Sequence, residues 1–159
     1  MERKAKPKLE LPDALDARVF VSVMRTADAL SRGAEALLKP FNLSGTQYNV
    51  LRILRGAGEQ GLACREVGCK LISRDPDITR LLDRMESRGL IARAREKDDR
   101  RVVKTRITLE GLRLLQELDE PVRELHRRQM RHLTAKQLKQ LSILLDRTRE
   151  PFEESASSN

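Results

Sequence analysis

A dense group of basic residues near the middle of the chain carries the clearest chemical signal. In the 14 positions from Arg93 to Arg106, seven residues are basic and three are acidic, so this stretch supplies half of the net charge of +8. Arginine at such density binds polyanions, and the negative potential of the DNA minor groove attracts it without a base code. The group therefore predicts contact with nucleic acid, and a charged loop that only aids solubility is the alternative. Its basic members are Arg93, Arg95, Lys97, Arg100, Arg101, Lys104 and Arg106.

A second basic surface is expected on the helix that precedes this group. Apolar residues at helical spacing form the inner face of that helix: Ile78, Leu81, Leu82 and Met85. On the opposite face, Arg80 is best placed for a bidentate contact to guanine, and Thr79 can meet a thymine methyl or a phosphate. Arg84 shares this outer face, and Ser73 and Arg74 in the preceding turn are candidate phosphate contacts. Taken alone, such a face indicates only a solvated helix, but beside the basic group it favours DNA binding.

Acidic residues lie at the start of the same helix and on its outer face. Asp75 is expected to cap the helix, with Pro76 in its first turn and Gly89 just after its end. Phosphate would repel Asp77 and Asp83. We therefore expect these two residues to orient an arginine, to cap the helix or to accept a hydrogen bond from a cytosine amine.

The basic group itself has the period of a β-strand. Val103, Thr105 and Ile107 alternate with more polar residues, as in a strand with one wet face. A shorter strand is expected near 90–93, and the polar stretch REKDDRR forms the tip of the resulting hairpin. In this tip, Asp99 is expected to hold an arginine through a bidentate pair.

Two helices are expected upstream of these surfaces. The first runs from Leu15 to Lys39 with an apolar stripe along one side, and Pro40 ends it. The second begins at Ser44, which forms a capping box with Gln47.

Three glycines after the second helix raise the possibility of a dinucleotide site. Gly56, Gly58 and Gly61 match the pattern G-x-G-x-x-G, which binds a pyrophosphate only when it follows a strand and opens a helix. Here the glycines follow a helix, so we exclude that reading. We expect Gly56 to cap the helix, residues 58–61 to form a turn and residues 62–71 to form a short helix.

Two further helices are expected downstream of the hairpin. Thr108 starts the first, which should kink just before Pro121 and continue to about residue 131. Thr134 and Gln137 form a second capping box that starts the last helix.

Three short helices followed by a basic hairpin form a winged helix-turn-helix. The predicted fold class is therefore mainly α with a small β-hairpin wing, and the DNA-binding domain is expected at 41–108. Long helices at 15–40 and 109–152 have apolar faces that need a partner, and a second copy of the chain is the simplest one. We expect a disordered arm at 1–14 and a disordered tail at 153–159.

Composition argues against several other classes. No apolar run approaches the ~20 residues that a membrane-spanning helix needs, and the charged N-terminus is unlike a secretory signal. Cys64 and Cys69 are five residues apart, which separates them by about 140° on a helix, so neither a local disulfide nor a shared metal site is expected. We expect a reduced, cytoplasmic protein. A redox role for Cys64 is the alternative to a core cysteine.

No catalytic constellation can be picked out of the sequence. His126 and His132 are too far out of phase to share a ligand, so we assign them to the surface or to a dimer interface. Neither a Ser-His-Asp arrangement nor a pair of carboxylates stands out. We therefore expect no enzyme, no metal and no cofactor.

The stretches DITRLLDRMESRGLIAR and DDRRVVKTRITLEG resemble the MarR (multiple antibiotic resistance regulator) family of bacterial transcription factors. The resemblance implies a homodimer that grips double-stranded DNA at a pseudo-palindromic operator, and a small phenolic or lipophilic effector. It also implies roles for single residues. Asp99 corresponds to the wing aspartate and Arg101 to the wing-tip arginine, Arg93 stands at the start of the wing, and Thr79 with Arg80 matches the TR of the recognition helix.

Three departures from the family pattern bear on function. The run from Asp75 to Asp77 makes the start of the recognition helix unusually acidic, and Val102 stands where a smaller residue is usual. The first helix lacks the cysteine that oxidation-sensing relatives use. We expect a DNA-binding transcriptional regulator, and repression is the mode of regulation that we expect. The alternatives are a winged-helix module that binds an acidic protein and, with no polar cluster to support it, an enzyme on this scaffold.

Overall fold

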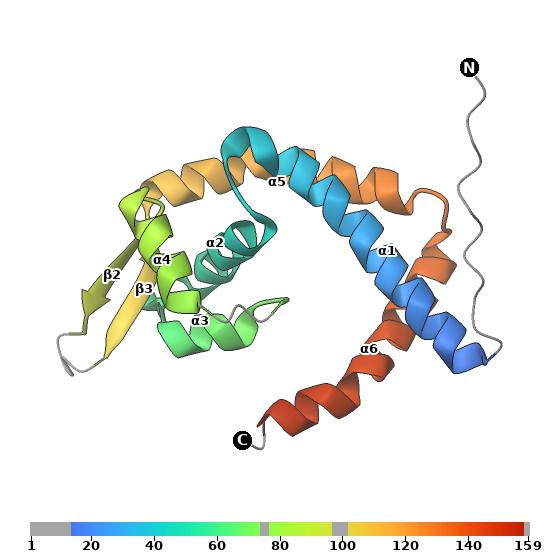
Figure 1. Cartoon of the computed structure of the whole chain (residues 1–159). Helices are drawn as coiled ribbons and strands as arrows, with labels where there is room; N and C mark the ends of the chain where they lie inside the picture. The colour runs from blue at the N-terminus through green and yellow to red at the C-terminus, as the bar shows by residue number, and fades with distance from the viewer. Residues whose placement is uncertain (1–13, 74–76, 97–101, 158–159) are drawn as a thin grey trace. The chain divides into compact units, whose positions relative to one another are not determined.

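The computed structural model describes residues 14–73, 77–96 and 102–157 (Figure 1). It divides into two compact units, residues 1–117 and 118–159. The predicted fold class is confirmed: the structure is mainly helical with one small antiparallel sheet. In chain order the elements are α1 (Leu15–Leu38), the 3-10 turn η1 (Lys39–Phe41), α2 (Gly45–Ala57), the 3-10 turn η2 (Gly58–Gln60), β1 (Leu62–Ala63), α3 (Cys64–Lys70), α4 (Ile78–Ser87), β2 (Ile91–Arg95), β3 (Val103–Ile107), α5 (Leu109–Met130) and α6 (Ala135–Ser157).

Helices α1 and α2 begin and end close to their predicted positions. α1 ends at Leu38, and Pro40 lies in the 3-10 turn that follows. α2 starts with the predicted capping box: the Gln47 backbone amide donates to Ser44 Oγ at 3.1 Å, and Gln47 Oε1 accepts from the Ser44 amide at 3.0 Å. The prediction of Gly56 as the C-cap is wrong. The helix continues to Ala57 and the C-cap is Gly58, the residue with a positive φ of 60°.

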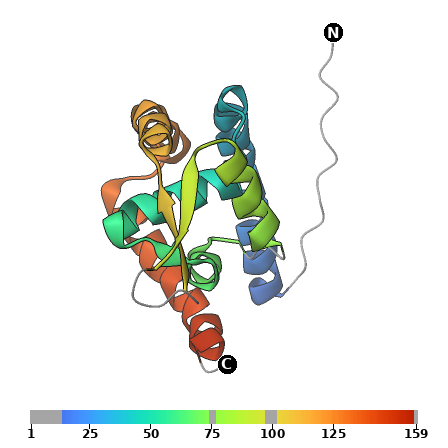
Figure 2. The same ribbon diagram turned by 90° about the vertical axis from the view of Figure 1, so that its left-hand side faces the viewer.

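The sheet has three strands in the order β1-β3-β2. β2 and β3 form the predicted hairpin, in which Ile91 pairs with Ile107 and Arg95 with Val103. The expectation that a helix begins at Leu62 is wrong, because Leu62 and Ala63 instead form the edge strand β1 and pair with β3. A two-residue strand is too short to show a period in the sequence. Figure 2 shows the hairpin beside α4.

The N-cap of helix α4 lies two residues later than the predicted one. The N-cap is Asp77, whose Oδ1 accepts a hydrogen bond from the Arg80 backbone amide at 3.3 Å. The predicted cap, Asp75, and its neighbour Pro76 lie outside the described residues. At the other end the chain turns at Gly89 as predicted, with φ at +69°.

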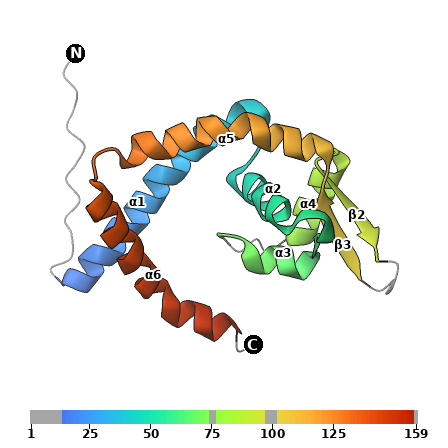
Figure 3. The same cartoon turned by 180° about the vertical axis from the view of Figure 1, so that it is seen from behind.

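The hydrophobic core of the first unit forms where α2, α3 and α4 gather next to the sheet, as Figure 3 shows from behind. The inner face predicted for α4 is confirmed for Leu81, Leu82 and Met85, which are buried, while Ile78 at the start of the helix is half-buried. The other buried apolar side chains of this unit are Leu38, Leu43, Val50, Leu51, Leu54, Val67, Leu90, Ile91 and Leu115. This core fixes α4 and the hairpin as neighbours.

The second unit consists of the end of α5 and the whole of α6. α5 continues through Pro121 as a single helix, and the kink expected before it stays a prediction. The capping box that starts α6 is confirmed, because Gln137 N donates to Thr134 Oγ1 at 3.3 Å and Thr134 N donates to Gln137 Oε1 at 2.9 Å. The predicted tail is wrong as far as Ser157, since α6 extends that far. Of the helices that the structure describes, none is both long and apolar enough to cross a membrane.

Candidate nucleic-acid interface

The outer face of α4 carries the residues that the sequence singles out. Thr79, Arg80 and Arg84 are exposed, and the side chain of Arg80 is 81% accessible. Because the inner face of the helix is buried in the core, these side chains are held outward by a rigid element. A helix presented in this way can enter a DNA groove.

Asp77 forms an ion pair with Arg80, the first arginine on the outer face of α4. In addition to capping the helix, it places Oδ2 3.1 Å from Arg80 Nε. Two of the roles expected for this carboxylate, capping the helix and orienting an arginine, therefore occur together. The backbone amide of Arg80 donates to Asp77 Oδ1, and the ion pair is formed through Nε, so neither contact uses the terminal amino groups.

Arg93 connects the hairpin to α4. Its Nε and Nη2 donate to Glu86 Oε2 at 2.9 and 2.6 Å, and Nη2 also donates to Asp83 Oδ1 at 2.5 Å. The Arg93 backbone amide donates to Glu86 Oε1 at 3.0 Å. These hydrogen bonds hold the pKa of Glu86 below its usual value and raise that of Arg93. The sequence predicts a DNA contact at Arg93, but this geometry favours a positioning role, in which Arg93 fixes the hairpin against the helix.

The base of the hairpin has a second fixed arginine. Arg106 Nε donates to the backbone carbonyl of Glu59 at 2.6 Å, and its Nη2 donates to Glu96 Oε1 at 2.6 Å. Gly61 allows this approach, because a Cβ there would lie 2.6 Å from both Arg106 Cγ and the Thr105 carbonyl oxygen. Paired arginines thus fix both strands, with Arg93 joining β2 to α4 and Arg106 joining β3 to the turn before β1.

The remaining sequence-predicted contacts are placed as follows. Arg95 is exposed at the end of β2, and Ser73 is exposed in the segment after α3. The others lie outside the described residues: Arg74, Lys97, Asp99, Arg100 and Arg101. Their roles stay predictions.

Both cysteines are free thiols, and Cys64 is half-buried while Cys69 is exposed. Cys64 lies at the start of α3, and its Sγ is 4.0 Å from Thr79 Oγ1 on α4. In the described part of the chain, no three His, Cys, Asp or Glu residues are grouped so that they can hold a metal ion.

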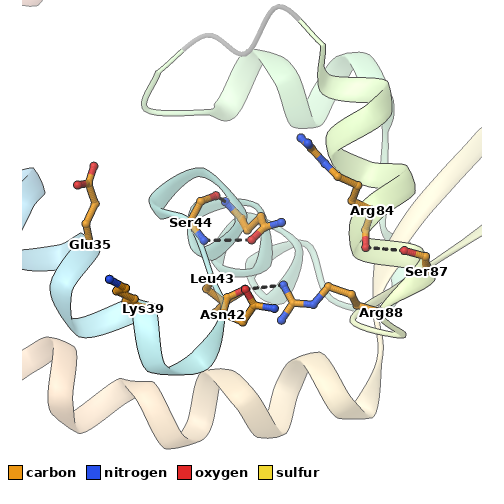
Figure 4. A pocket seen from close by; sticks show the side chains of 9 residues that line it. Glu35, Lys39, Asn42, Leu43, Ser44, Arg84, Ser87 and Arg88 are labelled. Atoms are coloured by element: carbon orange, nitrogen blue, oxygen red, sulfur yellow. Dashed lines mark hydrogen bonds between the residues drawn. The ribbon is translucent and has the colours of Figure 1, made fainter.

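An open cleft of about 610 Å³ lies between the end of α1, the start of α2 and α4 (Figure 4). Arg88 closes one side of it, because its Nη1 donates to the Asn42 carbonyl oxygen at 2.7 Å and its Nη2 donates to that of Phe41 at 3.4 Å. Sequence reasoning missed this contact, which joins residues 46 positions apart. The cleft is lined by Glu35, Lys39, Asn42, Leu43, Ser44, Gln47, Arg84, Ser87 and Arg88.

Comparison with known proteins identifies the family. The family model described as MarR family matches residues 43–103. The HTH-type transcriptional repressor IacR of Pseudomonas putida is 32% identical over 127 residues, which cover 80% of this chain and 75% of that protein. The chain belongs to the MarR family. The resemblance predicted from the sequence is confirmed, and MarR-family proteins are DNA-binding transcriptional regulators rather than enzymes.

Solved MarR structures share the fold. A MarR transcription factor from Planctomyces limnophilus is 41% identical, with a TM-score of 0.66 over 85% of this chain and 98% of that one. A variant of MarR from E. coli, in complex with operator DNA, is 25% identical, with a TM-score of 0.74 over 82% of this chain and 92% of that one. The segment that matches the family model, residues 43–103, includes α4, β2 and the candidate DNA contacts from Ser73 to Arg101.

Proposed function

We propose that this MarR-family chain is a homodimeric repressor that binds a pseudo-palindromic operator and releases it when a small effector binds. The observation that supports this most strongly is the exposed arginine face of α4, held next to a basic hairpin by the Arg93 cluster. We expect the protein to act in the cytoplasm, where its DNA lies.

On the DNA, α4 enters the major groove and the hairpin tip enters the adjacent minor groove. Arg80 reads a guanine through its terminal amino groups, and Thr79 contacts a thymine methyl or a phosphate. The other contacts follow the sequence prediction: Ser73, Arg74 and Arg84 near α4, and Arg95, Lys97, Arg100 and Arg101 in the hairpin, where Asp99 orients an arginine. The winged domain at 41–108 makes all of these contacts.

Dimerisation is supported by apolar faces that each unit leaves exposed. In α1 the exposed residues follow one helical face: Leu15, Val19, Phe20, Val23 and Met24. In α6 they are Leu141, Ile143, Leu144 and Phe152. Apolar surface of this extent is usual at an interface. We infer that residues 15–40 and 109–152 form it with a second copy, so that two α4 helices lie ~34 Å apart, one turn of DNA.

The effector is proposed to bind in the cleft of about 610 Å³, which has the size of a small-molecule site. Arg84 of α4 and Lys39 of η1 line it, so an occupant contacts both the DNA-reading helix and the end of the long helix α1. Three basic residues line the cleft, Lys39, Arg84 and Arg88, so we infer that the small phenolic or lipophilic effector carries an acidic group. It weakens DNA binding to the extent that it binds better to a dimer whose helix spacing does not match the operator.

The test is a titration of fluorescent duplexes at several salt concentrations. One duplex comes from the region upstream of the gene and the other has the same bases scrambled. The wild type should prefer the native duplex with a steep salt dependence, and Arg80→Ala and Arg101→Ala should each lose that preference. Arg127→Ala is the matched control, since it removes an exposed arginine that pairs with Glu124 on α5. Absence of binding to either duplex at low salt would contradict the proposal and favour a module that binds an acidic protein.

A further inference from the structure

Asp77 and Arg80 form a fixed pair at the end of α4 that faces DNA in the proposed function. Asp77 uses Oδ1 to accept from the Arg80 backbone amide and Oδ2 to hold Arg80 Nε. Its side chain is 49% accessible, so its negative charge reaches solvent. The pair is thus a surface feature, and burial is not what holds it in place.

The charge of Asp77 is unfavourable for binding phosphate. A free helix N-terminus attracts anions through its unpaired amides and the helix dipole. Here the carboxylate occupies that position and repels the DNA backbone. The other two acidic residues of α4, Asp83 and Glu86, are both paired with Arg93. Asp77 instead shares its charge with the arginine that is expected to read a base.

We propose that Asp77 is a positioning residue that sets sequence specificity. By holding Nε, it directs the two terminal amino groups of Arg80 outward, in the orientation that a bidentate contact to guanine needs. At a site without that guanine, Arg80 makes no base contact, and the repulsion between Asp77 and phosphate remains. Asp77 therefore lowers affinity for sites without the guanine, whereas at the operator the positioned contact of Arg80 outweighs the repulsion. The inference rests on the proposed function, in which Arg80 of α4 reads the major groove.

Replacing Asp77 with asparagine removes the negative charge at this position and keeps a side chain that can cap α4. Asparagine caps helices as well as aspartate, so α4 should keep its start and the melting temperature should stay close to that of the wild type. The negative charge and the ion pair are lost, and Arg80 becomes free to contact any nearby phosphate. Affinity for the scrambled duplex should rise about 3-fold, with a salt slope steeper by about one phosphate contact. Affinity for the operator should fall, so that the ratio between the two drops about 10-fold.

The matched control is Asp146→Asn. Asp146 forms an exposed i, i+3 ion pair with Arg149 on α6 and is not one of the apolar side chains assigned to the dimer interface, so this change removes the same charge from the same kind of pair outside the winged domain. It should leave the ratio of the two affinities unchanged. Arg80→Ala and the double variant Asp77→Asn/Arg80→Ala complete the set. In the Arg80→Ala background, Asp77→Asn should no longer lower affinity for the operator.

The outcomes separate this inference from the proposed function. If the wild type does not discriminate between native and scrambled duplexes, the proposed function fails. If the wild type and Arg80→Ala behave as expected but Asp77→Asn keeps the wild-type ratio, only the role of Asp77 is wrong. If Asp77→Asn weakens operator binding equally with and without Arg80, Asp77 contacts a base itself, and the positioning role is overturned.

Discussion

Replacing Glu86 with alanine removes the acceptor of three hydrogen bonds from Arg93, two from its guanidinium and one from its backbone amide. Exposed ion pairs contribute about 0.2–1 kcal/mol, and breaking a buried pair costs about 3–5 kcal/mol. The Arg93 and Glu86 side chains are 25% and 37% accessible, so solvent screens this pair only in part. We therefore expect a coupling free energy of about 1.5–2 kcal/mol between the two side chains.

The assay is a double-mutant cycle with Glu86→Ala, Arg93→Ala and the double variant. Urea unfolding of all four proteins at one protein concentration gives the coupling, since the stability of a dimer depends on concentration. The exposed pair of Glu124 and Arg127 on α5 serves as control, with an expected coupling below about 0.5 kcal/mol. A coupling at Arg93 no larger than that of the control would refute the view that this cluster fixes the hairpin against α4.

Three further predictions concern stability. The folded state lowers the pKa of Glu86 below its ordinary value of 4.5. The ionised carboxylate therefore stabilises the fold fully above pH 4.5, and this stabilisation is lost as the pH falls through the lowered pKa. In urea unfolding, the free energies of unfolding of wild type and Glu86→Gln should become equal in acid and differ above pH 4.5. Gly61→Ala should destabilise by at least about 2 kcal/mol, because φ is +61° and the new methyl would meet the Thr105 carbonyl oxygen; an unchanged urea midpoint would show that the turn adjusts. Ser44→Ala should cost about 1 kcal/mol through the lost N-cap, with Ser44→Asn close to wild type in thermal melts; equal losses in both would mean that the cap is not the cause.

Local rules predicted much of the fold. Both capping boxes depend on residues three positions apart, so the starts of α2 and α6 could be read directly from Ser44 and Thr134. The inner face of α4 follows from helical spacing, and the hairpin follows from the two-residue period of β3. The order of the predicted elements, three short helices followed by a basic hairpin, then indicated the winged helix-turn-helix that the comparisons confirm.

Features that depend on distant parts of the chain were not predicted. β1 exists only because Leu62 and Ala63 reach the edge of β3, some 40 residues further along the chain. The hydrogen bond from Arg88 to the Asn42 carbonyl oxygen depends on how α4 packs against the segment before α2, and no sequence pattern predicts it.

The role of Arg93 in the candidate site also depends on contacts that its local sequence does not show. Its place in a basic run predicts a contact with DNA. In the structure, Arg93 instead pairs with the carboxylates of Asp83 and Glu86 on α4. A signal for this was present in the sequence, since α4 carries Asp83 and Glu86 three positions apart, on one side of the helix.

Sequence-specific DNA binding by α4 and the hairpin is tested most directly by hydroxyl-radical footprinting on the region upstream of the gene. We predict protection that is symmetric about a centre, with two halves about one helical turn apart. In Arg101→Ala, the protected minor-groove positions outside each half should become accessible, while those next to α4 stay protected at higher protein concentration. Uniform protection along the duplex, or none at a concentration that saturates the titration, would contradict operator recognition by this winged helix.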